Sequence, residues 1–172
     1  MNNEIILETE RLLFRQHVVS DLDPYCAMEM DPDFRRYVGG RPRTREEAEQ
    51  KFKGSLKPIT NRLSMWAAVL KPEESYIGRC GIYPHFKPDG GIFEGEASLG
   101  LYIATKYWGR GFATEAGRAF TKFGFNELNL NRIVTIVQVG NIASVRVLEK
   151  LGFVLTETEV GMRSFYHFEL LP

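Results

Sequence analysis

The chain has 172 residues, with 22 Lys and Arg balanced by 22 Asp and Glu, and 44% of its residues are hydrophobic. One domain of this size can bury a sizeable core, and the balanced charge argues against a disordered chain and against broad electrostatic binding of nucleic acid. No apolar run approaches the roughly 20 residues of a membrane helix, and the acidic start does not fit a signal peptide. We therefore expect a single domain over residues 1–172, with neither a nucleic-acid nor a membrane partner.

The first half of the chain predicts a strand followed by two helices. Residues 11–17 mix apolar and polar side chains as a strand does, and Ser20 is a candidate cap for a helix that stops before Pro32. A second helix begins after Thr44, because Glu47 follows three residues later and completes a capping box.

This second helix is expected to end near Lys57, since Pro58 follows. Three strands come next, at 64–70, 76–83 and 94–103, and the short turns between them predict an antiparallel meander. The alternation in the third strand places Ala97, Leu99, Leu101 and Ile103 on one face and Glu96, Ser98, Gly100 and Tyr102 on the other.

The second half alternates helices and strands. Its predicted elements are a helix at 112–128, a strand at 132–139, a helix at 141–151 and strands near 153–158 and 163–170. The β-branched run at 132–139 is typical of a strand covered on both faces. A strand–helix–strand unit from 100 to 139 requires one parallel pair. The whole order predicts a mixed α/β (α+β) fold, with a mostly antiparallel sheet of about six to seven strands, a central parallel pair and about four flanking helices.

Cysteine and histidine are few and scattered. Cys26 and Cys80 each stand alone among apolar neighbours, which is typical of core thiols in a reducing compartment, and we expect a cytoplasmic protein. His17, His85 and His167 are far apart, and no HxxxH or CxxC spacing occurs, so no metal is expected.

The segment Trp108–Thr114, WGRGFAT, carries the chemistry. It lies between a strand and an amphipathic helix, where free N–H groups, the helix dipole and two glycines can hold a phosphate. The alternative is a glycine-rich turn without a ligand. A dinucleotide fold fits poorly, because the next strand ends in Gln138 and Val139 rather than an acidic residue, and no P-loop pattern occurs.

The segment YWGRGFATEA resembles motif A of the GNAT N-acetyltransferase superfamily, [QR]-x-x-G-x-[GA]. Gly111 takes the central glycine position and Ala113 the last one. Trp108 replaces the usual Gln or Arg, which is typical of the branch that resembles ribosomal-protein N-terminal acetyltransferases, the Rim type. NIASVRVLEKLGF at 141–153 resembles motif B, and ETERLLFR at 8–15 resembles the first Rim-type strand.

The resemblance implies a site for acetyl-CoA as co-substrate. Its pyrophosphate would bind the backbone N–H groups of Trp108, Gly109, Arg110, Gly111, Phe112, Ala113 and Thr114. The pantetheine arm would pair with the backbone of Leu101, Tyr102 and Ile103 as an added strand does. Asn141 would hydrogen-bond the pantetheine, or serve only as a helix N-cap.

The resemblance also implies direct transfer of the acetyl group to a primary amine, either a protein N-terminal α-amine or a small-molecule amine. Leu148 stands where many members carry a general-acid Tyr. Ser144 could hydrogen-bond the leaving thiolate instead, or be an exposed helical Ser. Glu96 is the candidate general base, with Glu94 second, and the alternative is a solvated strand-edge carboxylate. Ser98 stands at the commonest family position for this Glu.

The sequence leaves three questions open. The alternative to an enzyme is a CoA-binding or regulatory module without catalysis. A basic loop could repel a cationic acceptor, hold the adenosine phosphate of CoA or form a solvated turn; its arginines are Arg35, Arg36, Arg41, Arg43 and Arg45. The exposed edges of a mixed sheet allow a monomer or a homodimer.

Overall fold

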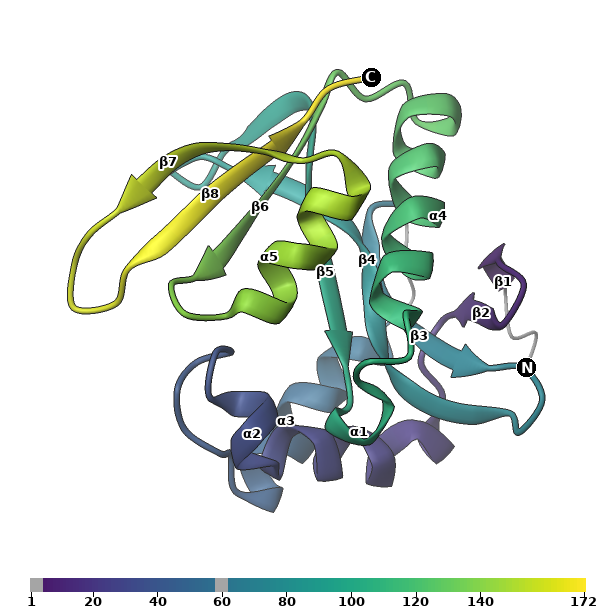
Figure 1. Ribbon diagram of the computed structural model, residues 1–172. Coiled ribbons are helices and arrows are strands. Elements are labelled where there is room, and N and C mark those ends of the chain that lie inside the picture. Colours follow the sequence, from purple (N-terminus) through teal and green to yellow (C-terminus); the bar gives the residue numbers. More distant parts are fainter. Residues whose placement is uncertain (1–4, 58–61) are drawn as a thin grey trace.

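The computed structural model describes residues 5–57 and 62–172, which form one eight-stranded sheet flanked by helices (Figure 1). The strands are β1 (Ile5–Glu8), β2 (Leu12–Arg15), β3 (Ser64–Leu70), β4 (Ser75–Phe86), β5 (Ile92–Ile103), β6 (Arg132–Gln138), β7 (Val154–Glu159) and β8 (Phe165–Leu170). The helices are α1 (Leu22–Met30), α2 (Pro32–Arg35), α3 (Arg45–Ser55), α4 (Phe112–Glu127) and α5 (Ile142–Leu151), with single 3-10 turns at Val19–Asp21 and Thr105–Tyr107.

The strand order is β1-β2-β3-β4-β5-β6-β8-β7, and only the β5–β6 pair is parallel among the described strands. The predicted mixed fold, with its antiparallel meander and central parallel pair, is therefore confirmed. The sheet is wider than expected, because β1 adds an edge strand by pairing with β2. A fifth helix, α2, is also present.

The start of α2 explains why the sequence analysis missed it. Pro32 occupies the first turn of α2, where a missing N–H costs nothing, and the Asp31 carboxylate accepts the N–H of Asp33 at 2.9 Å. Pro32, before which the first helix was expected to stop, thus also begins the next helix.

The helix caps are partly as predicted. Thr44 and Glu47 form the capping box, with Glu47 N donating to Thr44 Oγ1 at 3.2 Å and Thr44 N donating to Glu47 Oε2 at 2.9 Å. The prediction for Ser20 is wrong, because it lies within a 3-10 turn and Asp21 takes the cap position of α1. Pro58, used to predict the end of α3, lies outside the described residues.

The two faces of the sheet bury different clusters. On one face, α4 covers the larger core, which includes the predicted Ala97, Leu99 and Ile103 and the helical Phe112 and Phe120. On the other, α1 and α3 cover a smaller cluster, built from Tyr25, Cys26, Ala48, Phe52, Ala67 and Tyr76. Both cysteines are fully buried, as predicted, and burial raises the pKa of Cys80 to about 12. Neither thiol is therefore poised as a nucleophile.

The central parallel pair separates partway along its length. β5 and β6 pair only through Glu96, Ala97 and Ser98, opposite residues 132–134. Thr135 Oγ1 then donates to the Leu99 carbonyl at 3.0 Å, and beyond this point the two strands diverge (Figure 1). The expectation that β6 is covered on both faces is wrong, because Ile136 is 59% exposed at this divergence.

Candidate active site

A cavity of about 780 Å³ opens where β5 and β6 diverge. The ends of these strands, the loop before α4 and the first turns of α4 and α5 form its walls. Among the predicted residues it is lined by Leu101, Tyr102, Ile103, Trp108, Gly109, Gly111, Phe112, Ala113, Thr114, Asn141 and Ser144. Arg110, Glu96 and Ser98 do not line it. The structure thus brings both sequence motifs to one cavity.

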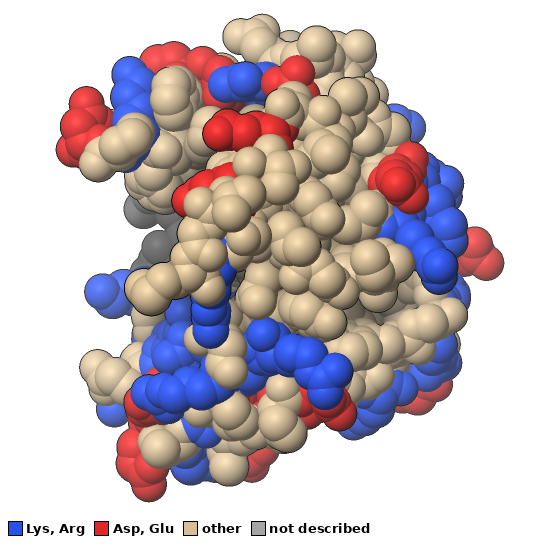
Figure 2. All heavy atoms as spheres, turned by 60° about the vertical axis from the view of Figure 1, so that its left-hand side comes forward, with Lys and Arg blue, Asp and Glu red and all other residues tan. Residues whose placement is uncertain are grey.

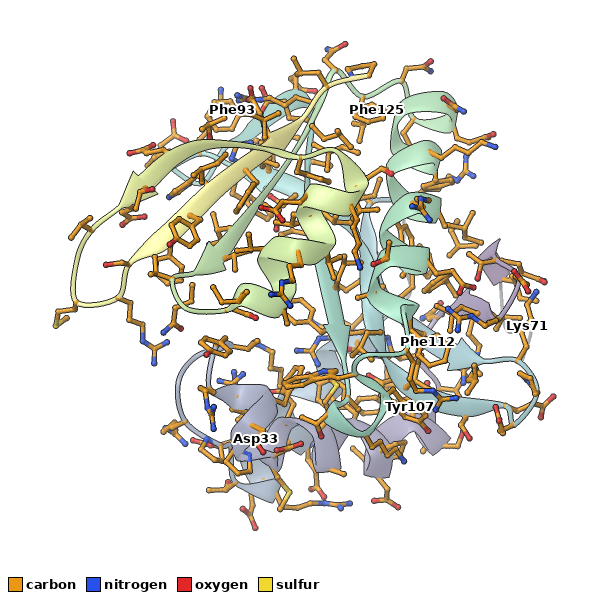
Figure 3. All side chains as sticks on the ribbon, in the orientation of Figure 1. Asp33, Lys71, Phe93, Tyr107, Phe112 and Phe125 are labelled. Atoms are coloured by element: carbon orange, nitrogen blue, oxygen red, sulfur yellow. The ribbon has the colours of Figure 1, made fainter. Side chains whose placement is uncertain are left out.

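The loop before α4 presents backbone N–H groups to this cavity. Gly109 and Gly111 have φ of +73° and +83°, which side-chain-bearing residues rarely adopt. Gly111 occupies the N-cap position of α4, and no side chain of the described residues caps this helix start. The first-turn N–H groups of α4 therefore stay available, and the positive end of the helix dipole lies beside them. Tyr107 and Phe112 meet edge to face at 6.3 Å at this helix start (Figure 3). The arrangement suits an anion.

Two further contacts fix the shape of this loop. Trp108 Nε1 donates to the Ile103 carbonyl at 2.7 Å and so ties the loop to the end of β5. The Ile103 carbonyl thus already accepts one hydrogen bond, and pairing of the backbone of Leu101, Tyr102 and Ile103 with a pantetheine arm stays a prediction. Glu115, in the first turn of α4, accepts from the Thr9 hydroxyl at 2.6 Å and from Arg11 Nε at 2.7 Å. Burial of the Glu115 carboxyl opposes its ionisation, but these donors lower its pKa below the usual range.

The start of α5 forms the opposite wall. Asn141 Oδ1 accepts the N–H of Ser144 at 3.2 Å, so the predicted N-cap role is confirmed. The Asn141 side-chain NH2 group makes no hydrogen bond with the described residues, and contact with a ligand stays a prediction. Leu148 is buried against the cavity and offers no proton there.

Glu96 lies away from the cavity in a polar cluster. Arg132 Nη2 donates to both of its carboxylate oxygens, at 3.0 and 2.9 Å, and His85 Nδ1 lies 2.8 Å from Oε2. Burial opposes ionisation, but Arg132 and His85 lower the pKa of Glu96. Four strand residues, about 13 Å, separate it from Gly100 at the mouth of the divergence. Its role as general base stays a prediction, and these ion pairs argue against it.

Ser98 faces the opposite side of the sheet from α4, and it lies directly across from Tyr83 on the neighbouring strand β4. Burial and the nearby Tyr102 raise the pKa of Tyr83 to about 12, although Ser98 acts in the other direction. Tyr83 is therefore a neutral hydrogen-bond donor at neutral pH. The catalytic role predicted for Ser98 stays a prediction.

A second hollow of about 370 Å³ adjoins the cavity, and both are lined by Val38, Gly39 and Tyr102. Arg35, Arg43, Lys51 and Arg79 bring four cationic side chains to it. Behind them Glu29 is fully buried. Burial opposes its ionisation, but its guanidinium neighbours, Arg79 foremost, lower the pKa of Glu29.

The basic loop divides into inward and outward arginines. Arg35 and Arg43 turn inward to Glu29, at 3.1 and 2.8 Å. The other three form exposed ion pairs: Arg36 with Asp33, Arg41 with Glu47, and Arg45 with both Asp23 and Glu49. These three fit the solvated turn that was one of the alternatives. Figure 2 shows Lys and Arg side chains gathered over the lower part of the molecule, where Figure 1 places α1, α2 and α3.

The sequence analysis missed Glu29, Lys51, Arg79 and Tyr83. One signal was present, because Arg79 interrupts the apolar strand sequence YIGRCGIY, and a charged residue in a buried strand needs a partner. Its partner Glu29 lies 50 positions earlier in the sequence, and Arg79 Nη2 donates to Glu29 Oε1 at 2.6 Å. No local sequence pattern predicts this contact.

Within residues 5–57 and 62–172, His, Cys, Asp and Glu side chains form no group of three or more that could hold a metal ion. In the same ranges no helix is both long and apolar enough to cross a bilayer.

The split parallel pair and the uncapped helix at its mouth define a GNAT-type acetyltransferase fold. The family model described as acetyltransferase (GNAT) domain matches residues 11–154, and the chain belongs to this family of N-acetyltransferases. The chain is 32% identical over 152 residues to the protein named N-acetyltransferase p20 of Bacillus licheniformis, covering 86% of this chain and 81% of p20. Over a shorter stretch, it matches a Bacillus subtilis relative whose name includes the words ribosomal N-acetyltransferase, in line with the Rim-type resemblance.

Solved structures agree on the fold. A GNAT-family acetyltransferase from Bacillus anthracis superposes with a TM-score of 0.82 at 24% identity, covering 96% of this chain and 97% of that one. Spermidine N-acetyltransferase from Vibrio cholerae, solved in complex with CoA and spermine, has a TM-score of 0.76 at 19% identity, with 95% and 96% coverage.

Proposed function

We propose that this enzyme transfers the acetyl group of acetyl-CoA to a primary amine, on a protein N-terminus or a small molecule, by direct attack in a ternary complex. The observation that carries the proposal is the cavity between β5 and β6, which runs from an uncapped helix N-terminus to the open edge of a strand. A diphosphate needs the first feature, and an extended pantetheine arm can use the second.

The chain's own groups suggest how acetyl-CoA would lie. The N–H groups of residues 109–114 would receive the pyrophosphate. The open edge of β5 at Leu101 and Tyr102 would pair with the pantetheine, while the Ile103 carbonyl stays bound to Trp108. The NH2 group of Asn141 would add a donor, because only its oxygen is used by the helix.

The chemistry requires an amine lone pair, a held thioester and a route for one proton. The amine nitrogen bonds to the acetyl carbonyl carbon and the carbon–sulfur bond breaks; the nitrogen then loses its extra proton to the departing thiolate, so that CoA leaves as the thiol. Holding both reactants in one cavity removes much of the entropic barrier. We propose that Ser144 donates a hydrogen bond to the leaving sulfur, in place of the Tyr that Leu148 replaces.

The amine must lose a proton before it attacks. No carboxylate lines either hollow within the described parts of the chain. We therefore propose that the proton passes to water, and that Glu96 could receive it only through a chain of water molecules.

Calorimetric titration with acetyl-CoA, followed by thiol release with a panel of amines and N-terminal peptides, tests the proposal. Binding together with acceptor-dependent thiol release is the expected result. Binding without turnover of any acceptor would favour the alternative, a CoA-binding module, which the buried Leu148 and the missing carboxylate also favour. Absence of acetyl-CoA binding would overturn the proposed function. Elution volume on gel filtration would decide between a monomer and a homodimer.

A further inference from the structure

The second hollow has more positive than negative charge. Both carboxylate oxygens of Glu29 already accept hydrogen bonds, from Arg79, Arg35 and Arg43, and Glu29 is fully buried behind these arginines. No carboxylate lines the hollow itself among the described residues. A cationic acceptor entering it would therefore meet like charge on most sides.

Two cationic groups there have donors that no described residue accepts. Arg79 is 8% exposed, and its buried Nη1 makes no hydrogen bond with the described residues. Lys51 is an exposed residue of α3 that lines the hollow, and its ammonium group forms no ion pair with the described residues. Burial and the nearby Arg43 and Arg79 lower the pKa of Lys51, which is the response of a cation crowded by cations. A buried N–H without an acceptor is costly, and because Arg79 lines the hollow, this unpaired nitrogen points to a ligand there.

We propose that the acceptor amine carries a carboxylate, and that Lys51 and Arg79 bind this carboxylate in the second hollow. The inference rests on the proposed function and names the substrate class. Arg43 also lines the hollow, and only its Nε reaches Glu29, so its terminal nitrogens stay available beside Lys51 and Arg79. Guanidinium groups bind the two oxygens of a planar carboxylate side by side, and phosphoethanolamine serves in the test as the phosphate counterpart. Tyr102 lines both the hollow and the cavity, so the amine end of such a molecule would point toward the thioester.

The test compares acceptor amines that carry a carboxylate with amines that lack one. Thiol release is measured at saturating acetyl-CoA with α- and ω-amino acids, their carboxamides, peptides with an acidic second residue, phosphoethanolamine and spermidine. We expect kcat/KM to be at least tenfold higher for the carboxylates than for the matched carboxamides. The free amino acids and the acidic peptides then tell which kind of molecule supplies the carboxylate.

The variant Lys51→Gln tests the assigned residue. We expect it to raise KM at least fivefold for the carboxylate acceptor, with no change for the carboxamide or in acetyl-CoA affinity. Lys53→Gln is the matched control on the same helix, because Lys53 lies 3.5 Å from Gln50 and does not line the hollow. Since Arg79 is held in the buried Glu29 network, its loss would endanger folding, and Lys51 is the sharper choice.

Preference for spermidine, phosphoethanolamine or the carboxamides would overturn the inference and leave the proposed function intact. So would a Lys51→Gln effect that is equal for the acid and its amide. If acetyl-CoA binds but no acceptor turns over, calorimetry of N-acetylated amino acids on the CoA-saturated protein decides, because absence of Lys51-dependent binding refutes the inference. Failure to bind acetyl-CoA at all would remove the proposed function and the inference together.

Discussion

Gly109→Ala and Gly90→Ala form a matched pair that isolates the anion-binding loop. The two glycines have φ of +73° and +87°, and beyond its chain neighbours a Cβ added at either would meet no heavy atom of the described residues within 4 Å. Alanine should therefore cost about the same at both, roughly 1–2 kcal/mol of backbone strain. Only Gly109 lines the cavity, while Gly90 lies in the turn between β4 and β5.

The difference between the two variants should be seen in binding. If the Gly109→Ala variant relaxes its strain by turning the peptide, one N–H leaves the pyrophosphate, and a hydrogen bond to a charged group is worth about 1.5–3 kcal/mol. That corresponds to an affinity for acetyl-CoA weakened by about 10- to 150-fold. Calorimetric titration measures this affinity, and urea unfolding measures the shared loss of stability. Equal affinity in wild type, Gly109→Ala and Gly90→Ala, with both variants equally destabilised, would refute the proposed role of this loop.

Three further substitutions test individual side chains. Glu96→Gln should lower kcat/KM less than tenfold, because the carboxylate is held by Arg132 away from the cavity; a loss of a hundredfold or more in a folded variant would instead identify it as the base. Asn141→Ala should lower stability by about 1 kcal/mol by removing the cap, and an unchanged acetyl-CoA affinity would leave Asn141 with that role alone. His17→Phe should remove part of the pH dependence of the free energy of unfolding. Burial lowers the pKa of His17 to about 4, so between pH 6.5 and 4 the unfolded chain binds more protons than the folded one, and stability falls as the pH falls. Between pH 7 and pH 4.5 the free energy of unfolding of the wild type should fall by about 2.5 kcal/mol more than that of the variant. Urea unfolding at both pH values measures this, and an equal fall in the two proteins would contradict it.

Local patterns predicted most of the fold. The alternation through Ala97 and Leu99 and the capping box of Thr44 and Glu47 depend only on neighbouring residues, so the sequence alone reveals them. The glycine-rich loop was also visible, because its chemistry lies in consecutive residues. In the structure this loop lines the cavity, and its binding of acetyl-CoA stays a prediction.

Contacts between distant segments could not be predicted in the same way. A β-branched run indicates a strand, but it says nothing about what covers each face, and Ile136 proved exposed. The bond from Trp108 to the Ile103 carbonyl and the ion pairs of Glu96 with Arg132 depend on how strands and loops meet in space. The charge balance of the second hollow likewise needed the fold.

The hydrogen bonds from Thr9 and Arg11 to Glu115 influence the order in which the domain folds. These hydrogen bonds join residues more than a hundred positions apart, whereas the β5–β6 pair joins residues 36 apart. Closing a longer loop costs more chain entropy, so the first turn of α4 gains its final anchor after the nearer strands have paired. A ligand bound at this turn would recognise only chains that have completed this closure, and would stabilise the whole domain by mass action.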